Sequence, residues 1–196
     1  PKSDNRLSRE QAISLVVSLS NKNSIFVSTT GMASRELYEY RKNNNQINRD
    51  FLTVGGMGHA SQIALGIASQ KKNKTIICID GDGALLMHMG SIAMIGNKNY
   101  KNFKHILINN GAHDSTGGQP TIANNLNLVS IAKMCGYTYA KSCITEASIK
   151  KTINDIKDIS GSCFIEIKVK KGNRNNLGRP KLSPEKTKKI FIKIIK

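Results

Sequence analysis

The sequence has no tryptophan, few aromatic residues and no long apolar run. Its longest apolar stretches, such as residues 76–79, are far shorter than the roughly 20 residues that a membrane-spanning helix requires. No charged segment followed by an apolar one opens the chain, so nothing in it indicates secretion. Pro1 rather than Met is the first residue, and a longer parent polypeptide is therefore one expectation. These absences argue against a membrane protein and against a secreted one.

Acidic residues are also scarce, because 13 Asp and Glu stand against 30 Lys and Arg, which gives a formal charge of +17. A charge of this size makes nucleic acid, an anionic surface and an acidic substrate candidate partners. The lysines, however, are dispersed except at the extreme C-terminus, and few aromatic side chains lie among them to stack on bases. Lys, Asn and Ile are all abundant, which is typical of a compositional bias. We therefore favour composition over nucleic-acid binding as the origin of the charge.

The four cysteines form no C-x-x-C pair and have no metal-ligand spacing. Cys78 and Cys163 lie in apolar, strand-like segments, where a thiol behaves as a small hydrophobic side chain. This usage is typical of a reducing compartment, so we expect a cytoplasmic protein. With 39% hydrophobic and 22% charged residues, the chain has the composition of an ordinary globular protein with a sizeable core.

Helix-like and strand-like segments alternate along almost the whole chain. A capping box, in which Ser8 is followed three residues later by Gln11, opens the first predicted helix. The predicted helices cover residues 8–19, 34–41, 61–70, 84–95, 128–134 and 146–156. The predicted strands cover residues 24–28, 52–54, 75–80, 106–109, 138–140 and 163–168. Apolar strands separated by helices of this length predict a doubly wound α/β fold, with a mainly parallel sheet and helices on both faces.

The C-terminal segment differs in composition from the rest of the chain. We expect residues 1–171 to form one domain that contains all the predicted strands. Residues 172–184 are rich in Gly, Asn and Pro, which predicts an irregular arm, and a short basic helix is expected between this arm and residue 196.

Glycines and small polar residues gather where several predicted strands end, at residues 29–31, 55–59 and 81–83 and from Asn109 onward. In an open parallel sheet, ligands bind beyond these strand ends. The most specific pattern joins Gly81-Asp82-Gly83 to Asn109-Asn110, because one helix and one return strand between them would place both turns side by side. An Asp carboxylate and an Asn amide oxygen are hard ligands suited to Mg²⁺. A helix that begins at Ala84 would offer free N–H groups to a diphosphate.

This constellation resembles the signature of thiamine-diphosphate enzymes, in which Gly-Asp-Gly is followed further along the chain by Asn-Asn. An isolated Gly-Asp-Gly would be a weak signal, since such a turn often only closes a strand. The resemblance implies that the side chains of Asp82 and Asn110 and the backbone carbonyl of Ala112 bind Mg²⁺. It also implies that the cofactor contacts further residues near the two turns, namely Gly81, Gly83, Ala84 and Ser115.

The segment Gly55-Gly56-Met57 adds a second likeness to these enzymes. Members of the superfamily hold the cofactor in a bent shape over a bulky apolar side chain, and a backbone carbonyl two residues earlier accepts a hydrogen bond from the aminopyrimidine. The resemblance implies that Met57 is the support and Gly55 the acceptor, with Gly56 beside them at the cofactor. The alternative is that Met57 only fills the core at a helix start. Thr30 and Gly31 resemble the loop that closes over the diphosphate and the pyrimidine.

Within this superfamily, four segments resemble the phosphonopyruvate decarboxylases, namely residues 28–37, 56–60, 109–121 and 177–180. Sulfopyruvate decarboxylases are the near neighbours, but their corresponding loop usually lacks the pair His113-Asp114. The resemblance implies a 2-oxo acid as substrate, and it covers only the C-terminal half of the family's usual polypeptide. It therefore implies a pyrimidine-binding domain that supplies a glutamate, from the same polypeptide or from a separate subunit. A homo- or hetero-oligomer is implied as well.

Two histidines are the candidate catalytic residues. His59 and His113 each flank a predicted cofactor loop, where an imidazole could donate a proton or bind an anionic substrate group. A structural or solvated role is the alternative for each. His88 and His105 are predicted to be non-catalytic, and Arg35 to be a charge on a helix surface. The remaining alternative of a different class is a cofactor-binding or assembly subunit without activity of its own.

Overall fold

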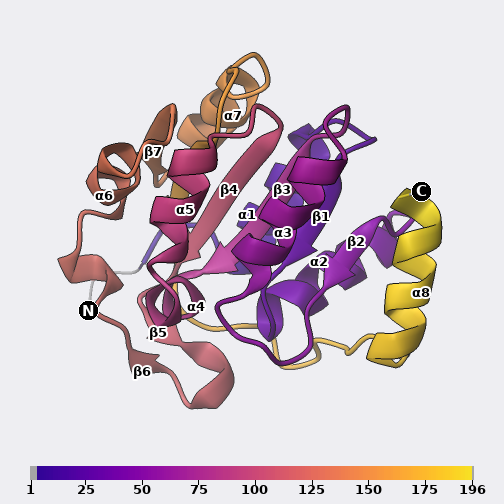
Figure 1. Ribbon diagram of the computed structural model, residues 1–196. Coiled ribbons are helices and arrows are strands. Elements are labelled where there is room, and N and C mark those ends of the chain that lie inside the picture. Colours follow the sequence, from indigo (N-terminus) through magenta and orange to yellow (C-terminus); the bar gives the residue numbers. More distant parts are fainter. Residues whose placement is uncertain (1–3, 196) are drawn as a thin grey trace.

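The computed structural model describes residues 4–195, and its centre is a sheet of six parallel strands (Figure 1). The strands lie in the order β2-β1-β3-β4-β8-β7, and each pair of neighbours is parallel. Their bounds are β1 Ile25–Ser28, β2 Asp50–Leu52, β3 Ile76–Gly81, β4 Phe103–Asn109, β7 Tyr139–Cys143 and β8 Cys163–Lys168. The parallel sheet predicted from the alternation of apolar strands and helices is thereby confirmed.

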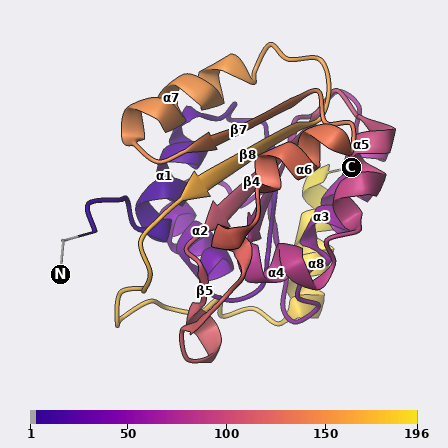
Figure 2. The same ribbon diagram turned by 90° about the vertical axis from the view of Figure 1, so that its left-hand side faces the viewer.

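Helices cover both faces of the sheet, as the two ribbon views show (Figures 1 and 2). One face carries α1 Arg9–Leu19, α2 Met32–Asn43 and α7 Glu146–Asp155. The other face carries α3 Ala60–Gln70, α4 Asp82–Met87, α5 Ser91–Lys98, α6 Leu128–Met134 and α8 Pro184–Ile195. The capping box at the start of α1 is present, because Ser8 Oγ accepts a hydrogen bond from the Gln11 backbone and Gln11 Oε1 accepts one from the Ser8 backbone. The doubly wound arrangement is therefore confirmed.

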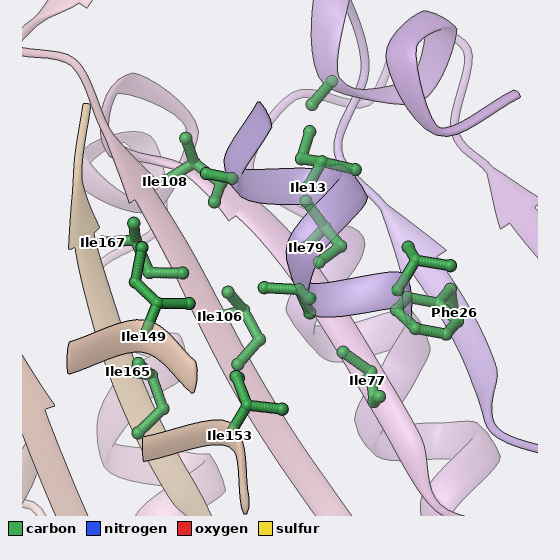
Figure 3. Close-up of a cluster of buried hydrophobic side chains, with 14 of the residues drawn as sticks. Ile13, Phe26, Ile77, Ile79, Ile106, Ile108, Ile149, Ile153, Ile165 and Ile167 are labelled. Carbon is green, nitrogen blue, oxygen red and sulfur yellow. The ribbon is translucent and has the colours of Figure 1, made fainter. Parts of the chain in front are cut away.

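The two cores follow from the alternation of side chains along the central strands. In β3, Ile77 and Ile79 pack into the core shared with α1, α2 and α7, whereas Ile76 and Cys78 pack into the core on the opposite face. Isoleucine supplies half of the buried residues of the first core (Figure 3). Strands that are buried on both faces read as continuous apolar runs, which explains why they were recognisable in the sequence. Both cores fix the strand ends that carry the loops described below.

Three local features differ from the sequence-based expectation. The helix predicted over residues 84–95 is two helices, because the backbone leaves the helical region at His88 (φ −133°, ψ 47°), where the ring packs against His59. Strand β2 begins earlier than predicted, since the backbone of Asp50 pairs in register with Phe26 and its buried carboxylate is held by Arg41. The loop after β4 contains a small antiparallel pair, β5 Ala112–His113 and β6 Gln119–Pro120, and two short 3₁₀ helices, η1 Asp114–Thr116 and η2 Ala123–Asn125.

The C-terminal arm runs back along the sheet to α8. The guanidinium of Arg174 pairs with Glu10 of α1 and Glu39 of α2, and the Gly178 N–H also donates to Glu39. Helix α8 packs beside β2, where the rings of Phe51 and Phe191 meet edge to face at 5.3 Å. The predicted short helix is confirmed, while the domain boundary at residue 171 stays a prediction. Among residues 4–195, no helix is both long and apolar enough to cross a bilayer.

Candidate functional site

A pocket opens beyond the carboxyl ends of β1, β3 and β4, at the end of the molecule where α4, β5 and β6 gather (Figure 1). Its lining residues come from five separate parts of the chain, which are Arg9, Thr29, Thr30, Met32, Ala33, Met57, the segment 80–84, Ile108, Asn110 and the segment 112–115. Ten residues predicted for the cofactor, the metal or catalysis are among them, namely Thr30, Met57, Gly81, Asp82, Gly83, Ala84, Asn110, Ala112, His113 and Ser115. The pocket therefore collects most of the predicted site.

Asp82 lies at the turn between β3 and α4, and only 2% of its surface is exposed. Its Oδ2 accepts a hydrogen bond of 2.5 Å from Thr121 Oγ1. Burial raises the pKa of the Asp82 carboxyl, although hydrogen bonds from Thr121 and from the backbone N–H groups of Asn110 and Gly83 oppose this rise. A carboxylate that is desolvated in this way gains stability from a nearby cation. The side chain therefore has the chemistry of a metal ligand.

Asn110 lies beside Asp82 because β3 and β4 are neighbouring parallel strands, with Gly81 in register with Ile108. The backbone N–H of Asn110 is close enough to the Asp82 carboxyl to lower its pKa, against the effect of burial. The Asn110 side chain is buried, and its Oδ1 accepts a hydrogen bond of 3.0 Å from the Ala112 backbone N–H. Asp82, Asn110 and Ala112 thus sit together, with a carboxylate, an amide oxygen and a backbone carbonyl as donors. Oxygen donors of these kinds suit Mg²⁺.

Gly83 is covered by two other predicted residues. A Cβ atom at position 83 would lie 2.5 Å from the His113 ring and 3.3 Å from Cε of Met57. Met57 comes from the loop between β2 and α3, and His113 comes from β5, so residues far apart in sequence converge on the Gly-Asp-Gly turn. Only a residue without a side chain lets the His113 ring and Met57 approach the turn this closely. The Gly83 backbone, the His113 ring and the Met57 side chain together form a cradle beside Asp82.

The loop after β1 closes another side of the pocket. Gly31 has φ +94°, a value that side chains rarely tolerate, and a Cβ atom there would lie 3.7 Å from Ser115 Oγ. Thr30 Oγ1 accepts a hydrogen bond of 3.2 Å from the Gly55 backbone N–H, which links this loop to the loop before α3. Thr29 Oγ1 is buried and has no hydrogen-bond partner within residues 4–195. An unpartnered hydroxyl that lines a pocket is a free donor for a ligand oxygen.

Four predicted residues are not among those that line this pocket, and one of them, Gly31, lies beside Ser115 at its edge. Gly55, Gly56 and His59 line a separate hollow beside the start of α8. His59 is exposed, its ring centroid lies 4.2 Å from that of His88, and its Nδ1 lies 3.2 Å from the Gly56 carbonyl oxygen. His59 therefore lines a different hollow from Asp82 and His113, and a catalytic role for His59 stays a prediction.

Several residues of the site were not identified from the sequence. Arg9 lines the pocket from α1 and forms ion pairs with Glu36 and Asp114, which lie far from it along the chain. Asp80 also lines the pocket, and it accepts a hydrogen bond of 3.2 Å from the buried ring of His105. An Arg in the first turn of a helix carries no local signal of such partners. Asp80 directly precedes the Gly-Asp-Gly turn at the end of an apolar run. This position is the one feature of the sequence that could have identified Asp80 as a residue of the site.

A comparison with known families agrees with this geometry. The fold and the pocket, with oxygen donors beside a glycine turn at the strand ends, suit a diphosphate-bearing cofactor and a divalent metal. The family described as "Thiamine pyrophosphate enzyme, C-terminal TPP binding domain" matches residues 27–167. The chain belongs to this family, whose cofactor, thiamine pyrophosphate, is the same compound as thiamine diphosphate and is used together with Mg²⁺. The predicted class of cofactor is thereby confirmed.

Two groups of curated decarboxylases are similar to this chain. The chain is 34% identical over 165 residues to a phosphonopyruvate decarboxylase of Streptomyces viridochromogenes, which covers 84% of this chain and 40% of the relative. It is 43% identical over 129 residues to the sulfopyruvate decarboxylase subunit beta of Methanocaldococcus jannaschii, covering 65% of this chain and 66% of that subunit. The corresponding subunit of Methanococcus maripaludis is 33% identical over 172 residues, covering 88% of this chain and 89% of the subunit. The chain therefore spans about two fifths of the first relative but nearly all of the last.

Solved structures show the same fold at low sequence identity. A benzoylformate decarboxylase from Polynucleobacter necessarius superposes with a TM-score of 0.69 at 16% identity, covering 84% of this chain and 33% of that one. A thiamine diphosphate-dependent 4-hydroxybenzoylformate decarboxylase from Rhodococcus jostii superposes with a TM-score of 0.68 at 15% identity, covering 89% of this chain and 34% of that one. These likenesses confirm the predicted fold class.

Proposed function

We propose that this chain is the diphosphate- and magnesium-binding half of a thiamine-diphosphate-dependent decarboxylase of 2-oxo acids, with phosphonopyruvate as its substrate and phosphonoacetaldehyde and carbon dioxide as products. The observation that carries the proposal is the placement of Asp82 beside Asn110 at the ends of β3 and β4, within a chain of the thiamine pyrophosphate family. The relatives at 34% identity that are phosphonopyruvate decarboxylases support the choice of substrate.

The residues of the two turns would hold the metal and the diphosphate. Asp82 and Asn110 would bind Mg²⁺ through side-chain oxygens and Ala112 through its carbonyl, because these donors are buried together and one of them is a desolvated carboxylate. The backbone around Gly81, Gly83 and Ala84 would receive the diphosphate, because this turn lines the pocket and its two glycines carry no side chains of their own. Thr30, Gly31 and Ser115 would close the opposite side, since Ser115 lies beside Gly31 across the pocket.

Other residues would orient the reacting part of the cofactor. Bound thiamine diphosphate supplies a cationic ring that accepts the electrons released when carbon dioxide leaves a 2-oxo acid. Met57 supports the bend of the cofactor in this proposal, and Gly55 and Gly56 contribute backbone groups beside it. His113 lies against Gly83 with its ring half-buried in the pocket. Its imidazole N–H would donate a hydrogen bond to the anionic end of the substrate or deliver a proton to the product.

The proposal includes a partner. The chain spans 40% of the phosphonopyruvate decarboxylase of Streptomyces viridochromogenes, and two relatives of comparable length are named as beta subunits. We infer that a pyrimidine-binding domain, on the same polypeptide or on a separate subunit, completes an oligomeric enzyme and supplies the glutamate that contacts the aminopyrimidine. Four free cysteines, three of them buried, support a cytoplasmic location. No nucleic-acid partner is part of the proposal.

Sulfopyruvate is the second candidate substrate, favoured by the 89% coverage of a sulfopyruvate decarboxylase beta subunit. Phosphonopyruvate and sulfopyruvate are both 2-oxo acids with a strongly anionic group, so one pocket could select either. His113 favours the phosphonate, because a dianion gains more than a monoanion from an additional hydrogen-bond donor.

A reconstitution assay tests the proposal. The chain is mixed with a pyrimidine-binding partner, thiamine diphosphate and Mg²⁺, and carbon dioxide release is measured from each of the two acids. We expect turnover of both to require the partner, with a higher kcat/KM for phosphonopyruvate. A higher kcat/KM for sulfopyruvate would establish the second candidate. Tight binding of the cofactor without turnover of either acid would instead indicate an inactive assembly subunit.

A further inference from the structure

One carboxylate oxygen joins three separate segments next to the predicted metal ligands. Asp114 Oδ2 accepts hydrogen bonds from Arg9 Nη1 at 2.8 Å, from Asn110 Nδ2 at 2.6 Å and from the Gly172 backbone N–H at 3.1 Å. These donors belong to α1, to the loop after β4 and to the C-terminal arm. The Asp114 side chain is only 9% exposed, so its bonds with Arg9 and Asn110 are partly shielded from water, whereas the bond from Gly172 is exposed. Charge-assisted hydrogen bonds in such surroundings are strong and directional.

These contacts determine the orientation of the Asn110 amide. The side chain of Asn has a donating end and an accepting end of nearly equal size, and a rotation of the amide exchanges them. An ionised carboxylate only accepts hydrogen bonds, so Asp114 holds the NH₂ group of Asn110 toward itself. Oδ1 then faces the other way, where it accepts the Ala112 N–H at 3.0 Å. The oxygen is thus directed away from Asp114 before any metal binds.

Arg9 in turn fixes Asp114. Its guanidinium also contacts both oxygens of Glu36, at 2.8 and 3.0 Å, and the side chains of Arg9 and Glu36 are 8% and 2% exposed. Burial raises the pKa of the Glu36 carboxyl, and Arg9 opposes that rise. Two carboxylates therefore compensate one guanidinium, which leaves no net positive charge at Arg9 for a substrate anion. Arg9 is bound on both sides by protein carboxylates, and it thereby holds Asp114 and the loop after β4 in place.

We propose that Arg9 and Asp114 are positioning residues that preset the side-chain oxygen of Asn110 for the magnesium ion. Partners that orient a metal ligand commonly change metal affinity by about 10- to 100-fold when they are removed. The inference rests on the proposed function, because it assumes that Asn110 is a ligand of the metal. It also assigns a role to the C-terminal arm, since Gly172 donates to the same oxygen of Asp114.

Amide hydrogen exchange of the 196-residue chain, followed by NMR without any ligand, tests the positioning directly. In Asp114→Ala we expect the Ala112 and Gly172 amides to exchange at least about tenfold faster, because their acceptors are freed or lost. The Gly111 amide is an internal control, since it donates to Asn109 Oδ1, which is outside this network. Its exchange should stay as in the wild type. Unchanged exchange at Ala112 and Gly172 would overturn the inference.

A titration provides the second readout. The Mg²⁺ concentration that half-saturates thiamine-diphosphate binding should rise about tenfold or more in Asp114→Ala. A double variant, Arg9→Gln with Glu36→Gln, should shift it in the same direction, because Asp114 loses its guanidinium while Glu36 is not left as a buried, unpaired carboxylate. The matched control is Arg41→Gln, because Arg41 also pairs with a buried carboxylate, Asp50, but neither residue lines the pocket.

The outcomes separate this inference from the proposed function. A shift in Mg²⁺ requirement for the Asp114 and Arg9 variants, but not for Arg41→Gln, supports positioning. Equal Mg²⁺ requirements in all variants overturn it while the proposed function stands. Failure of the wild-type chain, with its partner, to bind Mg²⁺ and thiamine diphosphate counts against the proposed function. The exchange rates at Ala112 and Gly172 still decide whether the network orders the loop.

Discussion

Replacement of Gly83 by alanine should change the shape of the cofactor cradle while the fold stays intact. The added methyl carbon would lie 2.5 Å from Cε1 and Nδ1 of His113 and 3.3 Å from Cε of Met57. Carbon atoms in contact are normally about 3.5 to 4.0 Å apart, so the imidazole must move by about 1 Å or more. Both neighbours are ends of side chains, and Met57 in particular is flexible. The ring is therefore displaced rather than the backbone.

The free energy of unfolding of Gly83→Ala should consequently differ from that of the wild type by no more than about 1 kcal/mol. Alanine stabilises the helical backbone of α4 by about that amount relative to glycine, and this gain offsets the cost of displacing the His113 ring. Affinity for thiamine diphosphate should fall about tenfold or more, or by at least about 1.4 kcal/mol, because the methyl group and the displaced ring occupy the cradle. Urea unfolding followed by circular dichroism measures the first quantity, since the chain has no tryptophan. Calorimetric titration of the assembled enzyme at saturating Mg²⁺ measures the second.

Gly66→Ala is the matched control. Gly66 is an exposed residue within α3, and a Cβ atom there would meet nothing within 4 Å. The substitution should raise the free energy of unfolding by about 0.5 to 1 kcal/mol and leave cofactor affinity unchanged. Wild-type affinity in Gly83→Ala would refute the reasoning, since the cofactor would then not approach the backbone at Gly83.

Asp82→Ala should abolish binding of the Mg²⁺–cofactor pair but keep the circular dichroism spectrum, because a carboxylate at a strand end adds little to the core; retained affinity would contradict its role as a ligand. Met57→Ala should lower kcat more than it lowers cofactor affinity, since the diphosphate anchors the cofactor and Met57 acts on its shape; wild-type kinetics would mean that Met57 only packs. His113→Ala should reduce kcat/KM for phosphonopyruvate by about tenfold to a thousandfold with little change in cofactor affinity, and normal turnover would assign substrate recognition to the partner. In the native chain a maleimide should label Cys135 first and Cys78 last, because burial raises the pKa of the Cys78 thiol well above its ordinary value and Cys135 is partly exposed; equal rates, measured by mass spectrometry, would exclude this order.

Much of the fold could be predicted because its determinants are local. Strands buried on both faces are continuous apolar runs, as in residues 76–79, and the helix after Ser8 is marked by its own capping box. The Gly-Asp-Gly and Asn-Asn turns could be placed side by side because one helix and one strand between them fit a parallel crossover. These inferences needed no knowledge of contacts between distant residues.

The remaining features depend on distant contacts. The end of α4 at His88 depends on packing against His59, which precedes it by a complete helix and strand. The role of Arg9 depends on Asp114, which is separated from it by 105 positions. Neither His88 nor Arg9 differs locally from an ordinary helix residue, so no pattern of spacing or composition distinguishes these two residues. Asp114 was visible only as part of the loop, and its contact with Asn110 required the structure.

The strand order β2-β1-β3-β4 has a consequence for how this protein could acquire a new specificity. The chain leaves β1 toward β2 on one side and leaves β3 toward β4 on the other, so the two connections diverge and open a crevice between them. The crevice is therefore created by topology and needs no particular loop sequence to exist. Exchange of the segment 111–121 for its counterpart from a sulfopyruvate decarboxylase would alter the walls of the crevice but neither core. Evolution between phosphonate and sulfonate substrates could thus proceed by loop replacement on an unchanged scaffold.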